Sequence, residues 1–125
     1  EKAPDSRYIH RGKFNWDLAE NIGDKNTVQG RLFHALSRLE EIRGNEPVFS
    51  ADAEVYTKDY SDTSILWIVR KAKGEELHAV FNFSDQDREV WMPEVRPYQN
   101  LVTDKTEEIC STVIPSWSFL WLKKA

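Results

Sequence analysis

Three polar side chains that could take part in binding lie close together near the start of the sequence. Arg7 and Arg11 flank His10. A guanidinium can pair with a carboxylate through two parallel hydrogen bonds and still present donors to the hydroxyl groups of a ligand. His10 can join such a network, or it can hold the loop through a structural hydrogen bond. Because a lone arginine near a terminus is usually solvated, the residue types alone leave both interpretations of Arg7 open.

Other patterns that carry chemistry are missing from the sequence. His10, His34 and His78 are widely separated, and no Cys/His pattern has zinc spacing. The five glycines never come closer than seven residues, so there is no glycine-rich phosphate loop. The acidic residues are scattered over a solvated helix face and turns. We therefore expect no bound metal, no cofactor and no catalytic residue in this chain.

Composition restricts the partners of the chain. Its 125 residues are 40% hydrophobic and 30% charged, which is typical of a globular domain. A net charge of -4 without a basic block argues against nucleic acid. The longest apolar runs, Ser64–Val69 and Ile114–Leu122, are far below the roughly 20 residues that cross a bilayer, so we expect no membrane partner. A single cysteine, Cys110, excludes an internal disulfide and gives no sign of an oxidising compartment, which slightly favours the cytoplasm.

The first third of the sequence predicts a loop and one amphipathic helix. A short helical turn is expected over Asn15–Asn21, with Asn15 as its cap. From Thr27 to Arg43 apolar residues recur at spacings of three and four, which predicts a helix with one apolar face. Gly44 is expected to form a left-handed cap, with Pro47 preventing continuation. The starting methionine and a signal peptide are missing, so the sequence reads as a piece cut from something longer.

The rest of the sequence predicts an antiparallel β-sandwich. Turn residues separate seven expected strands: Glu54–Thr57, Ser64–Ala72, Glu76–Ser84, Arg88–Met92, Gln99–Thr103, Glu107–Val113 and Ser116–Lys123. Lys73-Gly74 is the expected turn of the best hairpin. Cys110 is expected to be a buried strand residue. Residues 1–46 are thus assigned to the end of one domain, whose remainder would lie upstream, and residues 47–125 to a second domain.

Aromatic residues allow two interpretations. Trp67, Trp91, Trp117 and Trp121 fall on expected strands, where core packing is favoured over stacking on sugar rings. The strand with the last two is expected to be covered on both faces. Asn82 begins a formal glycosylation sequon, although a turn or a backbone hydrogen bond is the favoured role for its side chain.

The opening motif resembles one branch of a known enzyme family. Asp5-Ser6-Arg7-Tyr8-Ile9-His10-Arg11, followed by Trp16, is similar to the loop after the eighth barrel strand in the amylosucrase-like branch of the α-amylase family, glycoside hydrolase family 13. Gly12 stands where that branch has proline. Further similar segments cover nearly the whole chain: Gly30-Arg31-Leu32-Phe33 of the last barrel helix, Val80-Phe81-Asn82-Phe83-Ser84-Asp85 of a sandwich strand, and Ile114-Pro115 to Trp121-Leu122 of the closing strand.

The resemblance implies a fold and an activity for the parent protein. The chain would be a mainly β fragment, in which the loop and last helix of a (β/α)₈ barrel precede a C-terminal antiparallel β-sandwich. The parent would be a retaining glycosidase or glucosyltransferase acting on an α-glucoside such as sucrose or a maltooligosaccharide, with its catalytic Asp and Glu upstream. Arg7 would pair with a barrel aspartate at the substrate site, and His10 is the weaker candidate there. The alternatives are a non-catalytic carbohydrate-binding module and a purely structural domain.

Overall fold

The computed structural model describes residues 13–125, which fall into two compact units. Within this range the first unit ends at Arg38, and the second runs from Leu39 to Ala125. We call residues 13–38 the helical unit and residues 39–125 the sheet unit, and describe each by itself. None of the helices in the described part is long and apolar enough to cross a membrane.

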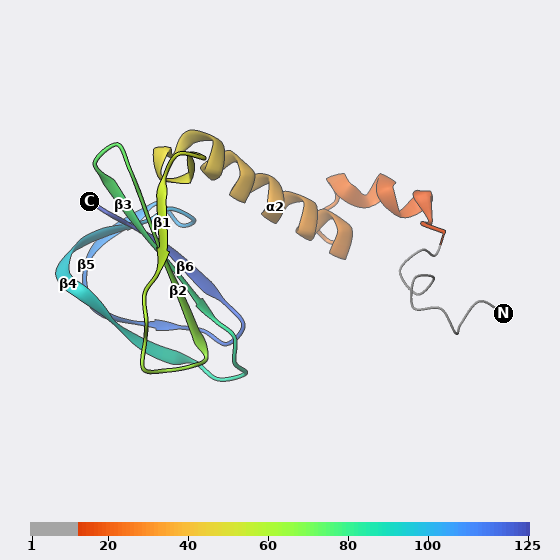
Figure 1. The fold of residues 1–125 in the computed structure, drawn as a ribbon. Helices are drawn as coiled ribbons and strands as arrows, with labels where there is room; N and C mark the ends of the chain where they lie inside the picture. Colours follow the sequence, from red (N-terminus) through yellow and green to blue (C-terminus); the bar gives the residue numbers. More distant parts are fainter. Residues whose placement is uncertain (1–12) are drawn as a thin grey trace, which may run out of the picture. The chain divides into compact units, whose positions relative to one another are not determined.

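The helical unit contains a short 3-10 helix and the first part of a longer α-helix (Figure 1). The 3-10 helix η1 spans Trp16–Gly23, and the Asn15 side chain accepts a hydrogen bond from the Asp17 N–H, which confirms the predicted cap. Helix α2 spans Val28–Asn45. At its start the Thr27 hydroxyl accepts from the Gly30 N–H at 3.0 Å and donates to the Asp24 carbonyl at 2.7 Å. The predicted start of this helix is therefore confirmed.

The end of α2 differs from the prediction. Gly44 lies inside the helix, and the one described glycine with a positive φ is Gly74. The Glu46 N–H still bonds to the Ile42 carbonyl at 3.0 Å, so the helical pattern outlasts the glycine. Pro47 then ends it, because proline has no N–H and disfavours helical geometry in the residue before it. Pro47 also opens the short 3-10 helix η2, Pro47–Phe49.

The sheet unit is mainly antiparallel β, which confirms the predicted fold class. The described residues form β1 (Glu54–Thr57), β2 (Ile65–Ala72), β3 (Glu75–Asn82), β4 (Arg88–Asn100), β5 (Lys105–Ile114) and β6 (Phe119–Lys124). Hydrogen bonding joins them in the order β1-β2-β3-β6-β4-β5 (Figure 1). Strands β6 and β4 pair over three residues only, Tyr98–Asn100 against Leu122–Lys124. The strands β1-β2-β3-β6 on one side of this short junction and β4-β5 on the other form two layers, and side chains of both layers meet in one buried cluster.

Two apolar clusters hold the sheet unit together. The inner cluster lies between the layers and combines residues of β2, β3, β4, β5 and β6: Ile65, Trp67, Val69, Val80, Val90, Met92, Tyr98, Ile109, Ile114 and Leu122. The outer cluster lies on the other face of β3 and β6, under the end of α2 and under η2: Ile42, Val48, Leu77, Ala79, Leu101 and Trp121. Alternate side chains of the central strands therefore enter different clusters, and both faces of β3 and β6 are used.

The β2–β3 hairpin follows the prediction closely. Ala72 pairs with Glu75, which leaves a two-residue turn made by Lys73 and Gly74. Their φ angles are +52° and +81°. Positive φ at both positions matches the right-handed twist of the two strands, and glycine adopts it without steric cost.

Strand β4 is longer than predicted. The sequence predicts two strands here because Pro93 and Pro97 interrupt the run, yet Arg88–Asn100 is a single strand. The register against β5 shifts between Trp91 and Arg96, so the segment around Pro93 bulges out of the ladder. Pro97 pairs with Glu108 within the ladder. A proline is tolerated where its nitrogen points away from the partner strand or lies at a bulge.

Three predictions of burial are wrong, and two are confirmed. Trp67 and Trp121 are buried core residues, as predicted. Trp91 is exposed because it lies on the outward face of the β4–β5 layer, and Cys110 is exposed for the same reason beside buried Ile109. Trp117 is not on a strand at all: β6 begins at Phe119, and Trp117 sits in the preceding turn with a φ of +52°.

Candidate functional site

The predicted binding residues, Arg7 and His10, lie outside the described residues. The described residues begin at Lys13. Phe14 and Trp16 follow, and their rings meet edge to face with centroids 5.1 Å apart. Asn15 between them caps η1. The end of the predicted loop is thus an aromatic pair leading into a short helix.

The helical unit carries apolar side chains that its own residues leave uncovered. Trp16 is 77% exposed, and no residue of η1 is buried. On α2, Val28, Leu32 and Leu36 recur every four residues along one face, and each is more than half exposed. We call these three residues the helical stripe. Outside this stripe, the helical unit has four further exposed apolar side chains, Phe14, Leu18, Ile22 and Phe33. An amphipathic helix with its apolar face open is the signature of a surface made to be covered.

Gly30 shows how tightly the helical unit is folded locally. A Cβ atom at this position would lie 1.8 Å from the Asp24 carbonyl oxygen, so any larger residue would force the η1–α2 turn away from the helix. The Thr27 hydroxyl lies in the same contact, within 3.1 Å of the Asn21 carbonyl. The turn is therefore closely packed, even though the apolar side chains near it are exposed to solvent.

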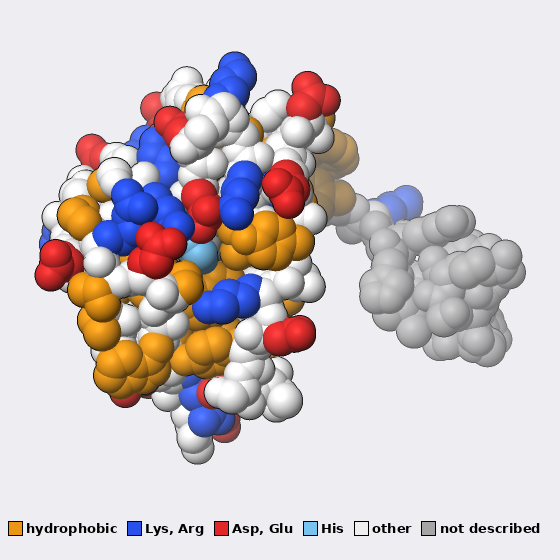
Figure 2. Space-filling view, turned by 60° about the vertical axis from the view of Figure 1, so that its left-hand side comes forward, with side chains coloured by type: hydrophobic (Ala, Val, Ile, Leu, Met, Phe, Trp, Pro, Cys, Tyr) orange, Lys and Arg blue, Asp and Glu red, His pale blue; other side chains and the backbone are white. Residues whose placement is uncertain are grey.

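A polar cluster centred on His78 is the main group of charges near the core of the sheet unit. His78 is 2% exposed. Its Nδ1 accepts from the Trp67 indole N–H at 3.0 Å, and its Nε2 lies 2.8 Å from Glu76 Oε1. An indole only donates, so Nδ1 must be unprotonated and Nε2 carries the hydrogen given to Glu76. Lys124 lies 2.9 Å from Glu76 and 2.9 Å from Glu94. Figure 2 shows acidic and basic side chains mixed around a histidine on one face of the molecule.

The electrostatics of this cluster fit a structural role. Burial lowers the pKa of His78, and the Glu76 carboxylate offsets this only in part. Burial raises the pKa of Glu76, but the hydrogen bonds and charges of Lys124 and His78 outweigh it, so the net pKa is lowered. Lys124 also lowers the pKa of Glu94. A retaining glycosidase needs one carboxyl that stays protonated as an acid. Both of these carboxyls are ionised at neutral pH, so the cluster is not such a pair.

Asn82 ties together two loops at the other end of the sheet. Its Nδ2 donates to the carbonyls of Gln86, Ile114 and Pro115 at 2.8 to 3.1 Å. Its Oδ1 accepts from the Ser84 N–H at 3.0 Å and from the Ser84 hydroxyl at 2.7 Å. Asn82 is 2% exposed. The predicted role in backbone hydrogen bonding is confirmed, and its burial leaves no room for a glycan.

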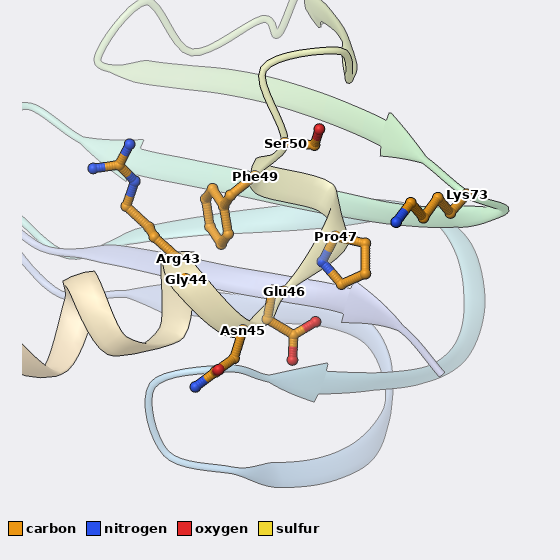
Figure 3. Close-up of a pocket in the computed structure, with 8 residues that line it drawn as sticks. All are labelled: Arg43, Gly44, Asn45, Glu46, Pro47, Phe49, Ser50 and Lys73. Atoms are coloured by element: carbon orange, nitrogen blue, oxygen red, sulfur yellow. The ribbon is translucent and has the colours of Figure 1, made fainter.

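A shallow hollow lies where α2 passes into η2. It has a volume of about 300 Å³ and is lined by Arg43, Gly44, Asn45, Glu46, Pro47, Phe49, Ser50 and Lys73. Figure 3 shows Arg43 and Lys73 on opposite sides of it, with the Arg43 guanidinium directed away and the Lys73 amine directed toward Pro47. Glu46 is engaged by Lys123 at 2.6 Å. Since the Arg43 side chain is directed away and Glu46 is already paired, we assign no chemistry to the hollow.

Sequence reasoning missed the His78 cluster. Glu76 and His78 are two residues apart, which places both on one face of a strand. A buried histidine with a carboxylate beside it on the same face could have been suspected from this spacing. The partners Trp67 and Lys124 could not, because strand pairing brings them in from distant parts of the sequence.

Comparison with solved structures identifies the class of fold. The chain has the fold of the C-terminal antiparallel β domain of α-amylase-family enzymes, as the resemblance of its motifs implied. Trehalulose synthase MutB from Pseudomonas mesoacidophila MX-45 matches 86% of the chain with a TM-score of 0.69 and 20% identity. An α-amylase from Anoxybacillus matches 76% of it with a TM-score of 0.64 and 12% identity, and a maltogenic amylase from S. marinus matches 80% with 0.61 and 16%.

The chain is much shorter than the proteins whose fold it shares. The chain spans 19% of the trehalulose synthase, 22% of the α-amylase and 13% of the maltogenic amylase. No family model matches the chain, and no curated protein matches it. At identities of 12 to 20% the likeness is one of fold.

Proposed function

We propose that this chain is the C-terminal part of a retaining α-glucoside enzyme of the α-amylase family. In this proposal residues 1–46 end the catalytic barrel, and residues 47–125 form a domain that stabilises it. The observation that carries the proposal is the combination of an open helical stripe with a sheet unit of this fold. At the junction between a barrel and its C-terminal domain, the last helix packs its apolar face on the barrel, whereas the domain that follows has its own core. The exposed helical stripe and the separate core of the sheet unit fit this arrangement.

The amylosucrase-like branch is the finer proposal, and the opening motif supports it. One of the matched structures is a MutB variant in complex with the substrate sucrose. For this chain we propose sucrose or a maltooligosaccharide as the substrate, with glucosyl transfer or hydrolysis through a covalent intermediate. The nucleophile and the acid/base would be supplied upstream. The chain alone should therefore release no sugar from sucrose or maltooligosaccharides, and release above a buffer control would contradict this.

Arg7 is the residue in this chain that we propose to act at the substrate site, with His10 as the weaker candidate. Its guanidinium would hold a barrel carboxylate beneath one glucosyl ring. In the full-length protein, Arg7→Ala leaves that carboxylate unpaired, at a cost of about 2–4 kcal/mol, so kcat/KM should fall roughly 30- to 1000-fold. Lys13→Ala is the matched control, because Lys13 is a neighbouring cation without a proposed partner in the site. Equal kinetics of the two variants would reduce the loop to a connector.

A carbohydrate-binding module is the second candidate, and the exposed tryptophans favour it. Trp91 is 57% exposed on the outward face of β4, and Trp117 is 69% exposed in its turn. An open indole can stack on a sugar ring, as aromatic residues at interfaces do. Titration of the chain with maltoheptaose, followed by tryptophan fluorescence, tests it. Saturable quenching that is lost in Trp91→Ala or in Trp117→Ala would favour the carbohydrate-binding module. An upstream reading frame without barrel-like alternation of strands and helices would exclude the enzyme hypothesis.

A further inference from the structure

The turn before β6 holds a tryptophan in a backbone conformation that tryptophan rarely adopts. The Ser118 N–H donates to the Pro115 carbonyl at 3.2 Å, which closes a four-residue turn with Ser116 and Trp117 at its centre. Trp117, the third residue of this turn, has a φ of +52°. A positive φ at the third position favours glycine, because a bulky side chain there crowds the backbone. A tryptophan at this position therefore costs free energy that a glycine would not.

Burial of the Trp117 ring does not compensate for this cost. The residue is 69% exposed and belongs to neither apolar cluster of the sheet unit. The turn is also held without the ring, since the Trp117 N–H donates to the Ser84 carbonyl at 3.0 Å and the Ser116 N–H donates to Asp87 Oδ1 at 2.9 Å. A strained residue that is not needed for packing points to a binding role for its side chain.

The polar side chains beside this turn have hydrogen-bonding capacity left. Gln86 and Asp87 lie in the loop that is bonded to the turn, and both are exposed. Among the described residues, the Gln86 side-chain amide and the second carboxylate oxygen of Asp87 have no hydrogen-bond partner. A sugar ring combines an apolar C–H face, which stacks on an aromatic ring, with hydroxyl groups that need such partners. The surface around Trp117 offers both.

The other exposed tryptophan of the sheet unit lacks these surroundings. Trp91 is 57% exposed, but it lies on a strand without a positive φ. Strand pairing places Ser111 opposite Trp91. The Ser111 hydroxyl already donates to Glu89 Oε1 at 2.9 Å, and Glu89 is on the same face as Trp91. The polar groups nearest in the ladder to Trp91 are therefore bonded to each other, so Trp117 is the better candidate for binding a sugar.

We propose that Trp117 and the loop residues Gln86 and Asp87 form a glycan-binding site of the sheet unit. The indole stacks on one glucosyl ring of an α-glucan, and the amide of Gln86 and the carboxylate of Asp87 bind its hydroxyl groups. The choice of an α-glucan rests on the proposed function, whereas the position of the site rests on the turn itself. Selection for this binding explains why the turn carries a tryptophan in place of the glycine that its backbone favours.

The test titrates the ¹⁵N-labelled 125-residue chain with maltoheptaose and follows the indole N–H signals of its five tryptophans. The signal of Trp117 is identified by its loss in Trp117→Gly. It should shift saturably, whereas the signal of Trp91 should stay in place. Trp117→Gly should weaken binding at least roughly tenfold, because the stacked ring surface is lost.

Two further variants and a stability measurement separate binding from folding. Trp117→Phe keeps an aromatic ring and should restore most of the binding that Trp117→Gly loses. Trp91→Ala is the matched control and should bind like the wild type. The urea midpoint of Trp117→Gly should be no lower than that of the wild type, since glycine adopts a positive φ without steric cost. A lower midpoint would show that the ring stabilises the fold, and would overturn the argument for the site.

Other contrary results have distinct meanings. An equal response to cellohexaose, whose glucosyl units are β-linked, overturns the assignment to an α-glucan. A Trp117 signal that responds in the chain but not in the full-length protein assigns the ring to a contact between domains and overturns the site. An unresponsive Trp117 in a protein whose full-length form cleaves α-glucosides overturns the site and leaves the proposed function standing. A full-length protein without that activity, whose Trp117 binds maltoheptaose, overturns the proposed function and supports the site.

Discussion

The helical unit and the sheet unit contain similar apolar residues, but the helical unit exposes them and the sheet unit buries them. Trp16 of the helical unit is 77% exposed, whereas Trp67 of the sheet unit is 1% exposed. Val28, Leu32 and Leu36 stand open on α2, whereas Val69, Val80 and Val90 are enclosed between two layers. The comparison teaches that the apolar pattern of a segment states only that it needs cover. Whether the cover is its own or belongs to another part of a protein is decided by tertiary structure.

The open stripe has an energetic consequence. Full burial of one valine or leucine side chain contributes about 1.5–3 kcal/mol. A helix of this length is marginal by itself in water, so most of its stability has to come from packing of its apolar face. The sheet unit already has that packing. The first half of α2 obtains it only when a partner covers the helical stripe.

Amide hydrogen exchange should give the largest difference between the units. Strand β3 is bonded to β2 on one side and β6 on the other, so its amides should exchange only when the sheet unit opens. In the isolated chain, amides of residues 28–38 should exchange roughly a thousandfold faster than those of β3, given typical domain stabilities. In the full-length protein this gap should narrow. Equal protection of both segments in the isolated, monomeric chain would break the comparison.

Two tryptophan substitutions test the comparison of the helical unit with the sheet unit at single residues. Trp67→Ala removes a buried ring from the inner cluster and should cost about 3–5 kcal/mol of unfolding free energy, enough to unfold most domains of this size. Trp16→Ala should change it by less than about 0.5 kcal/mol in the isolated chain. Urea unfolding followed by circular dichroism measures both. A large effect of Trp16→Ala would mean that the chain itself covers this ring.

Substitution of two polar residues extends the test to hydrogen bonds. Asn82→Ala removes the donor of one buried and two partly buried backbone carbonyls, those of Ile114, Gln86 and Pro115, and should destabilise the sheet unit by about 1–3 kcal/mol. Thr27→Ala removes the cap of α2 and should cost the helix about 1 kcal/mol while leaving the unfolding of the sheet unit unchanged. Urea titrations with separate probes of helix and sheet distinguish the two. A sheet midpoint that also shifts in Thr27→Ala would show that the units unfold as one.

A pH titration should give the smallest effect and concerns the sheet unit alone. Because the folded pKa of His78 is lowered, the unfolded chain binds a proton that the folded state resists. The stabilisation is complete above the ordinary histidine pKa of about 6.5 and is lost as the pH falls from there through the folded value, by at most about 1.4 kcal/mol per pH unit. Glu76, whose pKa is also lowered, acts at lower pH.

The control for this titration is a change in the other unit. His78→Gln should remove the dependence between pH 6.5 and the onset of carboxylate titration, and His34→Gln should leave the sheet unit unaffected. The groups that face His78 are Glu76, Lys124, Lys58, Trp67 and Tyr98. An unchanged slope in His78→Gln would show that a group other than His78 causes the pH dependence.

Local signals predicted local structure well. The start of α2 at Thr27, the Asn15 cap and the Lys73-Gly74 turn each depend on neighbouring residues only, and all three are confirmed. The end of α2 was placed too early because a glycine permits a left-handed cap without requiring one. The two prolines of β4 misled in the same way: they permit a break, and a bulge accommodates them.

Burial and the candidate site depended on information that the sequence does not carry. Trp91 and Cys110 are exposed because they lie on the outward face of the β4–β5 layer, and alternation along a strand does not say which face is inside. The His78 cluster needs strand pairing to assemble it. Arg7 and His10, the predicted binding residues, lie outside the described part of the chain, so their role stays a prediction.

The strand order leaves one edge of the described sheet at β5, and this edge bears on how the protein behaves at high concentration. Open edges are templates for adding a strand from another molecule, and charged side chains are the usual protection against it. Lys105, Glu107 and Glu108 protect the first half of β5. The second half, Ile109–Ile114, has no charged residue and contains Cys110, which is exposed. Aggregation of the purified chain should therefore begin at this half-strand, and a reducing buffer should keep any such contact from becoming covalent.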